Sequence, residues 1–337
     1  MKAIVYHGKE NIKLETVPSL LESAINSDEV LIKVAYAGIC GSDLNIYAGV
    51  HPRAKAPLIM GHEFSGVIEI GNNHFAKGAP VTVRPLIMCG SCLACNSGFP
   101  HVCQSLKLYG IDVNGGMAQY VKVSADKIHV LPASLSLKLG AFVEPLAVGV
   151  HAVKRAGFKA GASTVVFGAG TIGLCVASVL KIGKASQIIV VEVNAFRRNF
   201  AKNLGFTVID PSTQSVIDEI GALTQGHGVD IAFDCAAHPS VAAILTKVVR
   251  VQGTLEIVGS YKFPPEFPLL DVEFKELTVI GTRVYTSEDF EEAITLITQD
   301  FPFESLITVL APDAAQQGFE RALSGKDSIK VMYEFNY

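Results

Sequence analysis

The chain is poor in charged residues and has no excess of positive charge. Asp, Glu, Lys and Arg make up 18% of its 337 residues, and 28 Lys and Arg stand against 32 Asp and Glu, which gives a net charge of −4. A nucleic-acid-binding surface needs clustered Lys and Arg to neutralise phosphate groups. The charge balance therefore argues against a nucleic-acid partner and favours a small-molecule one.

Long uncharged segments are also scarce. Lys2, Lys9 and Glu10 interrupt the N-terminal segment before an apolar run typical of a signal peptide can form. Residues 160–180 carry no formal charge and are long enough to cross a bilayer, but their glycines are spaced as a strand, a tight turn and a helix start require. We therefore expect a cytoplasmic protein with no membrane partner.

The apolar pattern changes along the chain. Hydrophobic residues make up 49% of the sequence, enough for two sizeable cores. The first 150 residues contain short β-branched runs broken by Gly, Pro and Asn, which is typical of an irregular, mostly antiparallel β domain. From about Val148 onward, strands and helices alternate, and this βαβ repetition predicts a doubly wound parallel sheet and an α/β protein.

The second half of the chain allows individual elements to be predicted. We expect strands at 163–168, 187–193, 207–210, 230–236, 253–259 and 277–282, and helices at 170–183, 194–205, 212–225, 238–249, 287–299 and 314–325. The remaining C-terminal segment, with a last strand at 329–335, has too little apolar content for a core of its own. We therefore predict one domain from residues 1–148 and 285–337, and a second from residues 149–284.

Four of the seven cysteines form a compact cluster. Cys89, Cys92, Cys95 and Cys103 have the spacing C-x2-C-x2-C-x7-C, and steps of two residues bring sulfur atoms to the same side of a tight loop. We predict a structural zinc lobe at 89–103, with a redox pair or an iron–sulfur site as the alternatives.

Two other cysteines lie in apolar segments. Cys175 belongs to the expected helix at 170–183 and Cys235 to the expected strand at 230–236. Unpaired cysteine in such segments behaves as a small hydrophobe, so we expect both to be core residues.

A glycine-rich turn follows the apolar run VVF. Gly168, Gly170 and Gly173 form the pattern G-x-G-x-x-G and open an apolar helix. In this context the first glycine permits the tight turn, the second lets a pyrophosphate approach the backbone, and the third allows close packing of helix and sheet. We expect the whole turn, including Thr171 and Ile172, to bind a dinucleotide.

An acidic residue stands at the end of the next strand. Glu192 follows the turn by nineteen residues, and a carboxylate there accepts hydrogen bonds from ribose hydroxyls and repels a 2′-phosphate. This favours NAD over NADP. Arg197 and Arg198 come shortly afterwards and could argue for a phosphate, but Arg197 could equally stack on adenine or face solvent. We keep NAD and expect Arg197 to contact the cofactor.

Three further motifs supply metal-ligand side chains. ICGSDLN (39–45), GHEFSG (61–66) and FVEPLAVGVHA (142–152) contain Cys40, His62, Glu63 and Glu144, a set that suits an open catalytic zinc site. With the cysteine lobe and the GAGTIG turn, these motifs resemble those of the medium-chain zinc-dependent alcohol and polyol dehydrogenases, in the branch of sorbitol dehydrogenase and of sugar-acid enzymes such as L-galactonate or L-idonate 5-dehydrogenases. The resemblance extends from about Lys2 to Phe335, with all motifs in family order.

The resemblance implies a GroES-like catalytic domain followed by a Rossmann domain, with two zinc ions per chain and NAD. It implies that Cys40, His62 and Glu63 hold the catalytic zinc, and that Glu144 either ligates the zinc or holds its bound water. The alcohol dehydrogenase branch has a cysteine at the position of Glu144, so this glutamate favours the polyol branch.

Further roles follow from the same resemblance. Ser42 matches the hydroxyl that relays the substrate proton, and Asp43 is expected to accept a hydrogen bond from His62, with helix capping as its alternative. Asn45 departs from the histidine that many relatives carry, and an amide cannot act as a base near neutral pH. The proton must therefore leave through Ser42, the cofactor ribose, bound water or His51.

Three cations near these motifs are candidates for substrate contacts. Arg283 matches a family arginine that reaches the substrate site, with a surface ion pair as the alternative. Arg53 and Lys55 are placed to bind a substrate carboxylate, or are solvated loop residues.

The motifs together predict metal-assisted hydride transfer from a secondary hydroxyl of a polyol, sugar or sugar acid to NAD. L-Threonine or a small diol as substrate is the first alternative, and a noncatalytic NAD-binding protein of the same fold is the second. We expect a homodimer or homotetramer formed through the edge of the nucleotide-domain sheet.

Overall fold

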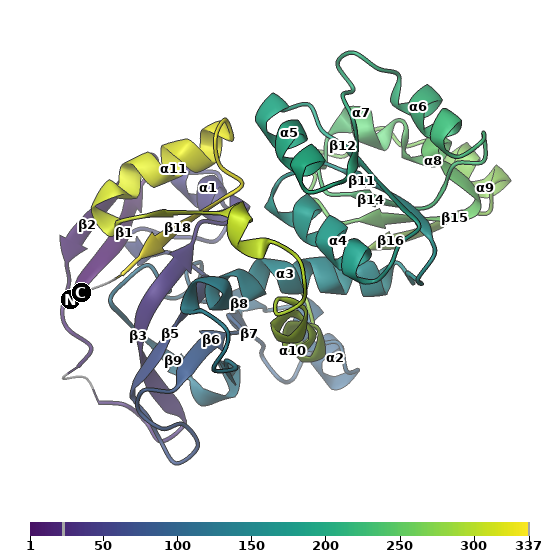
Figure 1. Cartoon of the computed structure of the whole chain (residues 1–337). Coiled ribbons are helices and arrows are strands. Elements are labelled where there is room, and N and C mark those ends of the chain that lie inside the picture. Colours follow the sequence, from purple (N-terminus) through teal and green to yellow (C-terminus); the bar gives the residue numbers. More distant parts are fainter. Residues whose placement is uncertain (22–23, 336–337) are drawn as a thin grey trace. The chain divides into compact units, whose positions relative to one another are not determined.

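A computed structural model describes residues 1–21 and 24–335, which form two compact units. The first unit contains residues Met1–Glu144, Thr286–Thr298 and the chain from Pro302 onward. The second contains Pro145–Tyr285 and Gln299–Phe301. The chain therefore leaves the first unit, forms the second and returns, as the colours of Figure 1 show.

The first unit is built on a seven-stranded sheet. Its strands run in the order β10-β6-β5-β3-β18-β17, with β9 also paired to β3, and all pairs are antiparallel except β17 with β18. The strands are β3 (Glu29–Gly38), β5 (Glu63–Ile70), β6 (Pro80–Val83), β9 (Tyr120–Ser124), β10 (Ile128–Val130), β17 (Ile307–Leu310) and β18 (Lys330–Glu334). The C-terminal strand thus pairs with a strand formed about 290 residues earlier.

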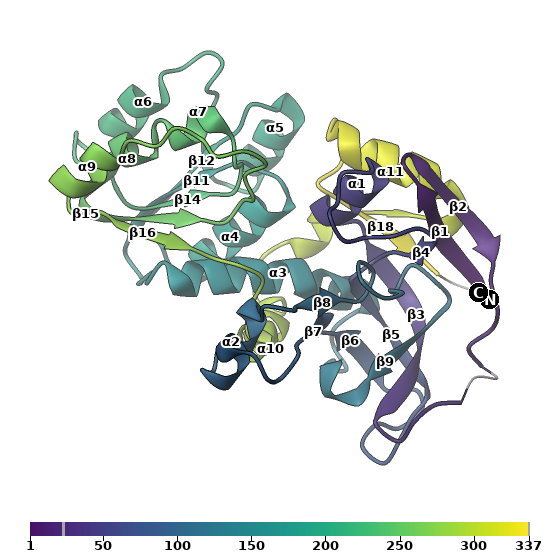
Figure 2. The ribbon, with the colours of Figure 1, turned by 180° about the vertical axis from the view of Figure 1, so that it is seen from behind.

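Two smaller sheets complete the first unit. An antiparallel sheet has the order β2-β1-β4, with β1 (Lys2–Gly8), β2 (Asn11–Thr16) and β4 (Leu58–Ile59). Figure 2 shows this sheet beside helices α1 (Gly41–Tyr47) and α11 (Ala315–Ser324). A second antiparallel pair, β7 (Leu86–Ile87) with β8 (Lys107–Leu108), flanks the cysteine lobe and its short helix α2 (Leu93–Asn96).

Helix α3 (Leu137–Arg155) was not predicted from the sequence. Pro145 lacks an amide N–H, and Gly140 and Gly149 disfavour a helix, so the local signal is weak. The glycines are explained by their neighbours: a Cβ on Gly140 would lie 2.5 Å from Leu131 Cδ1, and one on Gly149 would lie 2.9 Å from the backbone of Cys175. Packing thus overrides propensity, and the boundary between the units falls inside this helix.

The second unit contains a six-stranded parallel sheet. The order is β13-β12-β11-β14-β15-β16, which is the 3-2-1-4-5-6 order of a doubly wound dinucleotide-binding fold. The strands are β11 (Ser163–Phe167), β12 (Gln187–Val191), β13 (Thr207–Ile209), β14 (Val229–Asp234), β15 (Val249–Ile257) and β16 (Thr278–Gly281). The predicted fold class is therefore confirmed: an antiparallel β unit and a parallel α/β unit.

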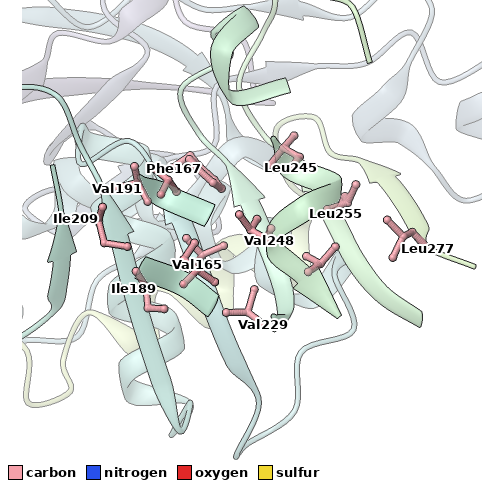
Figure 3. Close-up of a cluster of buried hydrophobic side chains, with 14 residues drawn as sticks. Val165, Phe167, Ile189, Val191, Ile209, Val229, Leu245, Val248, Leu255 and Leu277 are labelled. Atoms are coloured by element: carbon pink, nitrogen blue, oxygen red, sulfur yellow. The ribbon is translucent and has the colours of Figure 1, made fainter. Parts of the chain in front are cut away.

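Helices cover both faces of this sheet (Figure 1). One face carries α4 (Thr171–Ile182) and α5 (Ala195–Asn203), and the other carries α6 (Val216–Leu223), α7 (Pro239–Ala242), α8 (Leu245–Val248) and α9 (Leu269–Phe274). Figure 3 shows the apolar core on the second face, where side chains of α8 meet those of five strands, including Val165, Ile189 and Leu255. Thr286, where the chain returns to the first unit, is the N-cap of helix α10 (Ser287–Leu296).

One predicted helix is broken. A single helix was expected at 238–249, but the chain forms α7 and α8 separately, and β15 begins directly at Val249. Between them the amides of Ile244 and Lys247 bond to carbonyls three residues back, which tightens the chain into short turns. Leu245 and Val248 are thereby directed into the core.

The uncharged segment 160–180 forms a strand, a turn and part of a helix, as expected. It contains β11, the glycine turn and most of α4. In the part of the chain that the structure describes, no helix has both the length and the apolar character needed to cross a bilayer.

Glu256 on β15 is a buried acid. It has no exposed surface, and neither carboxylate oxygen forms a hydrogen bond within the described residues. Burial raises its pKa from 4.5 to about 8, and the Arg155 guanidinium opposes this only in part. Because the folded state holds a proton that the unfolded chain releases above about pH 4.5, the stability that this group contributes falls as the pH rises toward 8.

We expect Glu256→Gln to remove this loss of stability at high pH. Near pH 8 the variant should melt above the wild type by about 2–4 °C or more, and the difference should shrink near pH 5. Thermal unfolding at both pH values measures this, with the exposed Glu273→Gln as the control. An equal difference at the two pH values would contradict the assignment.

Candidate functional site

Three metal-ligand side chains meet in the first unit. Cys40 precedes α1, His62 precedes β5, and Glu63 begins β5. The register of β3 with β5 places Gly38 opposite Glu63, so that the residues just beyond β3 lie beside the start of β5. One ligand atom from each of Cys40, His62 and Glu63 lies within 4.8 Å of the other two.

This group suits a metal cation. His62 is 3% exposed and Glu63 is 1% exposed. Within the described residues, His62 Nδ1 and Asp43 Oδ1 are buried and form no hydrogen bond. A thiolate, an imidazole and a carboxylate form a donor set that zinc prefers.

The electrostatics of His62 lead to the same conclusion. Burial alone would lower the pKa of the imidazole, but the Asp43 carboxylate and the Cys40 sulfur outweigh burial and raise it well above its ordinary value. Glu144 acts in the same direction. The surroundings are therefore rich in negative charge and favour a cation at this place.

Ser42 and Asp43 on α1 flank His62 differently. Ser42 Oγ lies 3.4 Å from His62 Nε2, within hydrogen-bond reach. Asp43 Oδ1 is 3.8 Å from His62 Nδ1, which is an ion-pair distance and too long for the hydrogen bond that we expected. Instead, Asp43 Oδ2 accepts the amide of Cys40 at 2.9 Å, which caps α1 and fixes the cysteine.

Glu144 lies in α3 and is buried. It is outside the group of three whose ligand atoms lie within 4.8 Å of one another. Its negative charge is close enough to raise the pKa of His62 and of Lys330. Its place is therefore compatible with either role, as a ligand or as a partner of bound water.

Lys330 on β18 also lies at this group, although the sequence did not predict it as a site residue. Its ammonium group forms a buried ion pair with Glu63 Oε2 and donates a hydrogen bond to the carbonyl of Ile39 at 2.8 Å. A lysine within the apolar strand IKVMYEF was the available signal, but its partner could not be known without the strand pairing.

His51 is poorly placed to receive a proton. Its Nδ1 accepts the amides of Arg53 and Ala54 at 3.3 and 3.2 Å, so the proton of the neutral ring is held on Nε2. Burial and the Arg53 guanidinium lower its pKa. His51 therefore has no lone pair available for a substrate proton.

The other predicted cations lie at the surface. Arg53 pairs with Asp112 at 3.3 Å and also donates to the carbonyl of Leu106, so its guanidinium is already engaged. Lys55 and Arg283 are exposed, the latter just beyond β16 in the second unit. Their predicted substrate contacts remain predictions.

The four cysteines of the lobe come together. Sulfur atoms lie 4.0 Å apart for Cys89 and Cys95, 3.5 Å for Cys92 and Cys95, and 3.8 Å for Cys92 and Cys103. Four sulfurs around one tetrahedral zinc stand about 3.8 Å apart, given Zn–S bonds of about 2.3 Å. The spacing therefore matches a four-thiolate zinc site.

The protonation of the lobe also calls for a cation. The amides of Ser91 and Cys92 lower the pKa of Cys89 to about 6. Burial and the neighbouring Cys92 thiol raise that of Cys95 to about 12. The crowded sulfurs thus resist joint ionisation, and a divalent ion relieves that repulsion. Within the described residues, none of the seven cysteines forms a disulfide.

A cavity of about 420 Å³ lies in the second unit, at the carboxyl ends of β11, β12 and β14. Gly168 has φ of 96°, which favours glycine, and a Cβ on Gly173 would lie 1.8 Å from the carbonyl of Gly168. Gly170 caps α4 and lines the cavity, while Thr171 and Ile172 begin the helix. This is the crevice in which a doubly wound sheet binds a dinucleotide.

Glu192 fixes the glycine turn. Its Oε2 accepts the amide of Ala169 at 2.6 Å and its Oε1 accepts the amide of Asn194 at 2.8 Å. The carboxylate lines the cavity and retains further lone pairs for hydroxyl donors.

The two arginines after Glu192 differ. Arg198 pairs with Asp210 at 2.7 Å and donates to the carbonyls of Glu192 and Val193, so it is engaged. Arg197 lines the cavity, and its guanidinium lies 3.7 Å from the position of a Cβ on Gly170. Arg197 is therefore placed beside the glycine turn, and its contact with the cofactor remains a prediction.

Two residues that line this cavity were not predicted from the sequence. Cys235 lines the cavity and is partly exposed, so the prediction of a core residue was wrong for Cys235; Cys175 is fully buried, as predicted. His238 also lines the cavity. Both follow β14, whose end is bent back by Asp234, which accepts the amides of Ala236 and Ala237.

Comparison with known proteins agrees with this geometry. Residues 26–133 match the alcohol dehydrogenase GroES-like domain, and residues 171–299 match the zinc-binding dehydrogenase domain. The 2-dehydro-3-deoxy-L-galactonate 5-dehydrogenase of Pseudoalteromonas atlantica is 38% identical over 86% of both chains. Sorbitol dehydrogenase of Bacillus subtilis is 34% identical over 98% of this chain and 96% of its own. The structure of 2R,3R-butanediol dehydrogenase from Bacillus subtilis has a TM-score of 0.91 at 30% identity, with 99% of each chain covered.

Other similar proteins are named for a different substrate or contain a different cofactor. L-Threonine 3-dehydrogenase of Bacillus velezensis is 36% identical over 83% of both chains. A structure from Sinorhizobium meliloti that contains bound NADP has a TM-score of 0.90 at 29% identity, covering 99% of this chain and 98% of its own.

The fold and the two metal groups define a zinc-dependent dehydrogenase that uses a nicotinamide dinucleotide. The extent of the similarity makes the relationship specific: the chain belongs to the zinc-dependent medium-chain alcohol dehydrogenase family, among its polyol, sugar-acid and diol dehydrogenases. The noncatalytic alternative is therefore set aside.

We expect Cys95→Ser to remove one zinc ion per chain and to destabilise the protein, because three thiolates hold the ion less firmly than four. Metal analysis should fall from about two zinc ions per chain to one, and the melting temperature should fall by about 4 °C or more. Cys175→Ala, at a buried position away from both groups, is the control and should keep both ions. A Cys95→Ser protein that retains two zinc ions would contradict the assignment.

Proposed function

We propose that this enzyme oxidises a secondary hydroxyl of a polyol, sugar or sugar acid, with transfer of a hydride to NAD. The observation that supports this most directly is the group of half-buried Cys40 with buried His62 and Glu63, with Glu144 nearby in α3. The names of the sugar-acid and sorbitol dehydrogenase relatives support the same substrate class. Relatives named for L-threonine and butanediol support the second candidate, a small amino alcohol or diol.

Cys40, His62 and Glu63 are proposed to hold the catalytic zinc, with Glu144 as the fourth ligand or as the partner of bound water. A bound zinc supplies Lewis acidity toward the oxygen of the substrate hydroxyl. Cys89, Cys92, Cys95 and Cys103 are proposed to hold the structural zinc.

Ser42 is proposed to take up the proton of the substrate hydroxyl. Its hydroxyl is both donor and acceptor and lies beside His62, whereas the Asn45 amide is not a base and the available nitrogen of His51 already carries a proton. From Ser42 the proton passes to the cofactor ribose or to water.

The first unit is proposed to be the catalytic domain and the second the NAD-binding domain. In the second unit, Gly168, Gly170 and Gly173 make room for the pyrophosphate, Arg197 neutralises it, and Thr171 and Ile172 present the first amides of α4. Arg283 is proposed to contact the substrate.

A homodimer or homotetramer is proposed through the edge strand β16. Val279 on this strand and Leu269, Leu270 and Phe274 on α9 are exposed apolar side chains, and an unpaired strand edge offers backbone hydrogen bonds to a second copy. The seven cysteines without disulfides support a reducing, cytoplasmic location.

The test of the proposed function is NAD reduction by the zinc-loaded enzyme with polyols, hexonates, L-threonine and diols. We expect turnover with a polyol or sugar acid, and His62→Ala should abolish it because the metal group loses its imidazole. Zinc content should fall by about one ion per chain, while NADH binding, followed by fluorescence, should be retained. His227→Ala, an exposed histidine, should change neither. Full turnover in the His62→Ala protein would exclude the proposed site.

Glu192 is expected to decide the cofactor. Glu192→Gln keeps the shape of the side chain but loses the charge that repels a 2′-phosphate, so the ratio of kcat/KM for NADP to that for NAD should rise by about tenfold or more. Glu192→Ala should shift the ratio in the same direction but also weaken both cofactors, because the amide of Ala169 loses its acceptor. An unchanged ratio in both variants would reject this role.

A further inference from the structure

Lys330 is a buried lysine at the candidate zinc group. Its side chain is 2% exposed, and its only carboxylate contact within the described residues is with Glu63, whose side chain is 1% exposed. The ammonium group also donates a hydrogen bond to the carbonyl of Ile39, the residue before Cys40. The lysine therefore joins the segment that carries Cys40 to the strand that carries Glu63.

The fold makes room for this ion pair. Gly38 lies between the two strands involved, opposite Glu63 on β5 and opposite Met332 on β18. A Cβ on Gly38 would lie 2.2 Å from Glu63 Oε2 and 3.0 Å from Lys330 Cε. A larger residue at position 38 would therefore displace the pair.

Stability alone does not explain a buried ion pair. The desolvation cost of two buried charges commonly equals or exceeds their attraction, and well-packed apolar residues often replace such pairs without loss. A role at the metal group explains the retained charges better.

The charges of the group show what this role is. A zinc ion carries two positive charges, while Cys40, Glu63 and Glu144 together carry three negative ones when ionised, and Asp43 beside His62 adds a fourth. The site would then have an excess of negative charge, and the Lys330 ammonium offsets one of these charges. A positive charge held on Glu63 also draws electron density away from the carboxylate and so weakens its donation to a metal.

We propose that Lys330 is a positioning residue that holds Glu63 and offsets its charge, so that the zinc is bound less tightly and stays more electrophilic. This inference rests on the zinc site proposed above. It concerns how Glu63 meets the metal, and Lys330 itself does not touch the substrate.

The test is Lys330→Met, which keeps the length and removes the charge. Zinc-loaded protein is equilibrated with a graded series of chelator concentrations, and the two zinc ions are counted as they leave; the ion that His62→Ala lacks is the one of interest, and the four-cysteine ion serves as an internal reference. We expect that ion to be held about tenfold more tightly than in the wild type, with kcat lowered by about tenfold or more and KM for NAD unchanged. Lys330→Arg, which restores the charge, should return both values to within about threefold.

Controls separate this role from a structural one. Lys127→Met removes another buried lysine, paired with Asp126 away from the metal group, and should leave zinc affinity unchanged. If the Lys330→Met protein does not fold, Lys330→Gln carries the same expectation. Unchanged or weaker zinc binding in the folded variant would overturn the proposal.

The experiment also separates this proposal from the proposed function. Zinc affinity is measured without turnover, so a wild type that oxidises no member of the substrate panel would refute the proposed function and leave the affinity result decisive for Lys330. A wild type that turns over normally, with a Lys330→Met protein of unchanged zinc affinity, would refute the role of Lys330 alone.

Discussion

The metal group of this enzyme depends on one strand, β3, which pairs on one side with β5 and on the other with β18. The pairing with β5 sets Glu63 against Gly38, two residues before Cys40. The pairing with β18 brings Lys330 to the same point from the far end of the chain. A slip of either register by one residue would turn Glu63 or Lys330 to the opposite face of the sheet. Sheet register is therefore the constraint from which the arrangement of charges follows.

Buried carboxylates fix loops in both units by the same means. Asp43 accepts the amide of Cys40, Glu192 accepts the amides of Ala169 and Asn194, and Asp234 accepts those of Ala236 and Ala237. In each case the acid satisfies backbone donors at the end of a strand or the start of a helix, where the ladder provides none. Each loop held this way presents a functional group: the Cys40 sulfur, the glycine turn, or the wall of the dinucleotide cavity.

The sequence allowed the fold class and most elements of the second unit to be predicted, because the βαβ pattern and the glycine turn are local signals. The cysteine spacing is local as well. Helix α3 was missed because Gly140, Pro145 and Gly149 weaken its propensity, and only packing against Leu131 and Cys175 explains the two glycines. Lys330 and Cys235 were missed as site residues for a different reason: their partners come from strand pairing and loop curvature, which no short segment encodes. The predicted hydrogen bond from His62 to Asp43 was wrong because the Asp43 carboxylate accepts the amide of Cys40 and caps α1 instead.

The two metal groups show how burial and charge separate a structural site from a reactive one. The cysteine lobe lies at the surface, where Cys89 is exposed. Backbone amides stabilise the Cys89 thiolate, whereas a buried lysine accompanies the other group. Four thiolates saturate a tetrahedral ion, so such a site has no place for a substrate. In the other group, His62 and Glu63 are buried and Cys40 is half-buried. The group offers three different donors, and a lysine contacts one of them. Three donors leave one coordination position of a tetrahedral ion open. The positive charge of Lys330 near Glu63 would keep the bound ion electrophilic. The second group is thus suited to polarising an oxygen that enters from outside the protein.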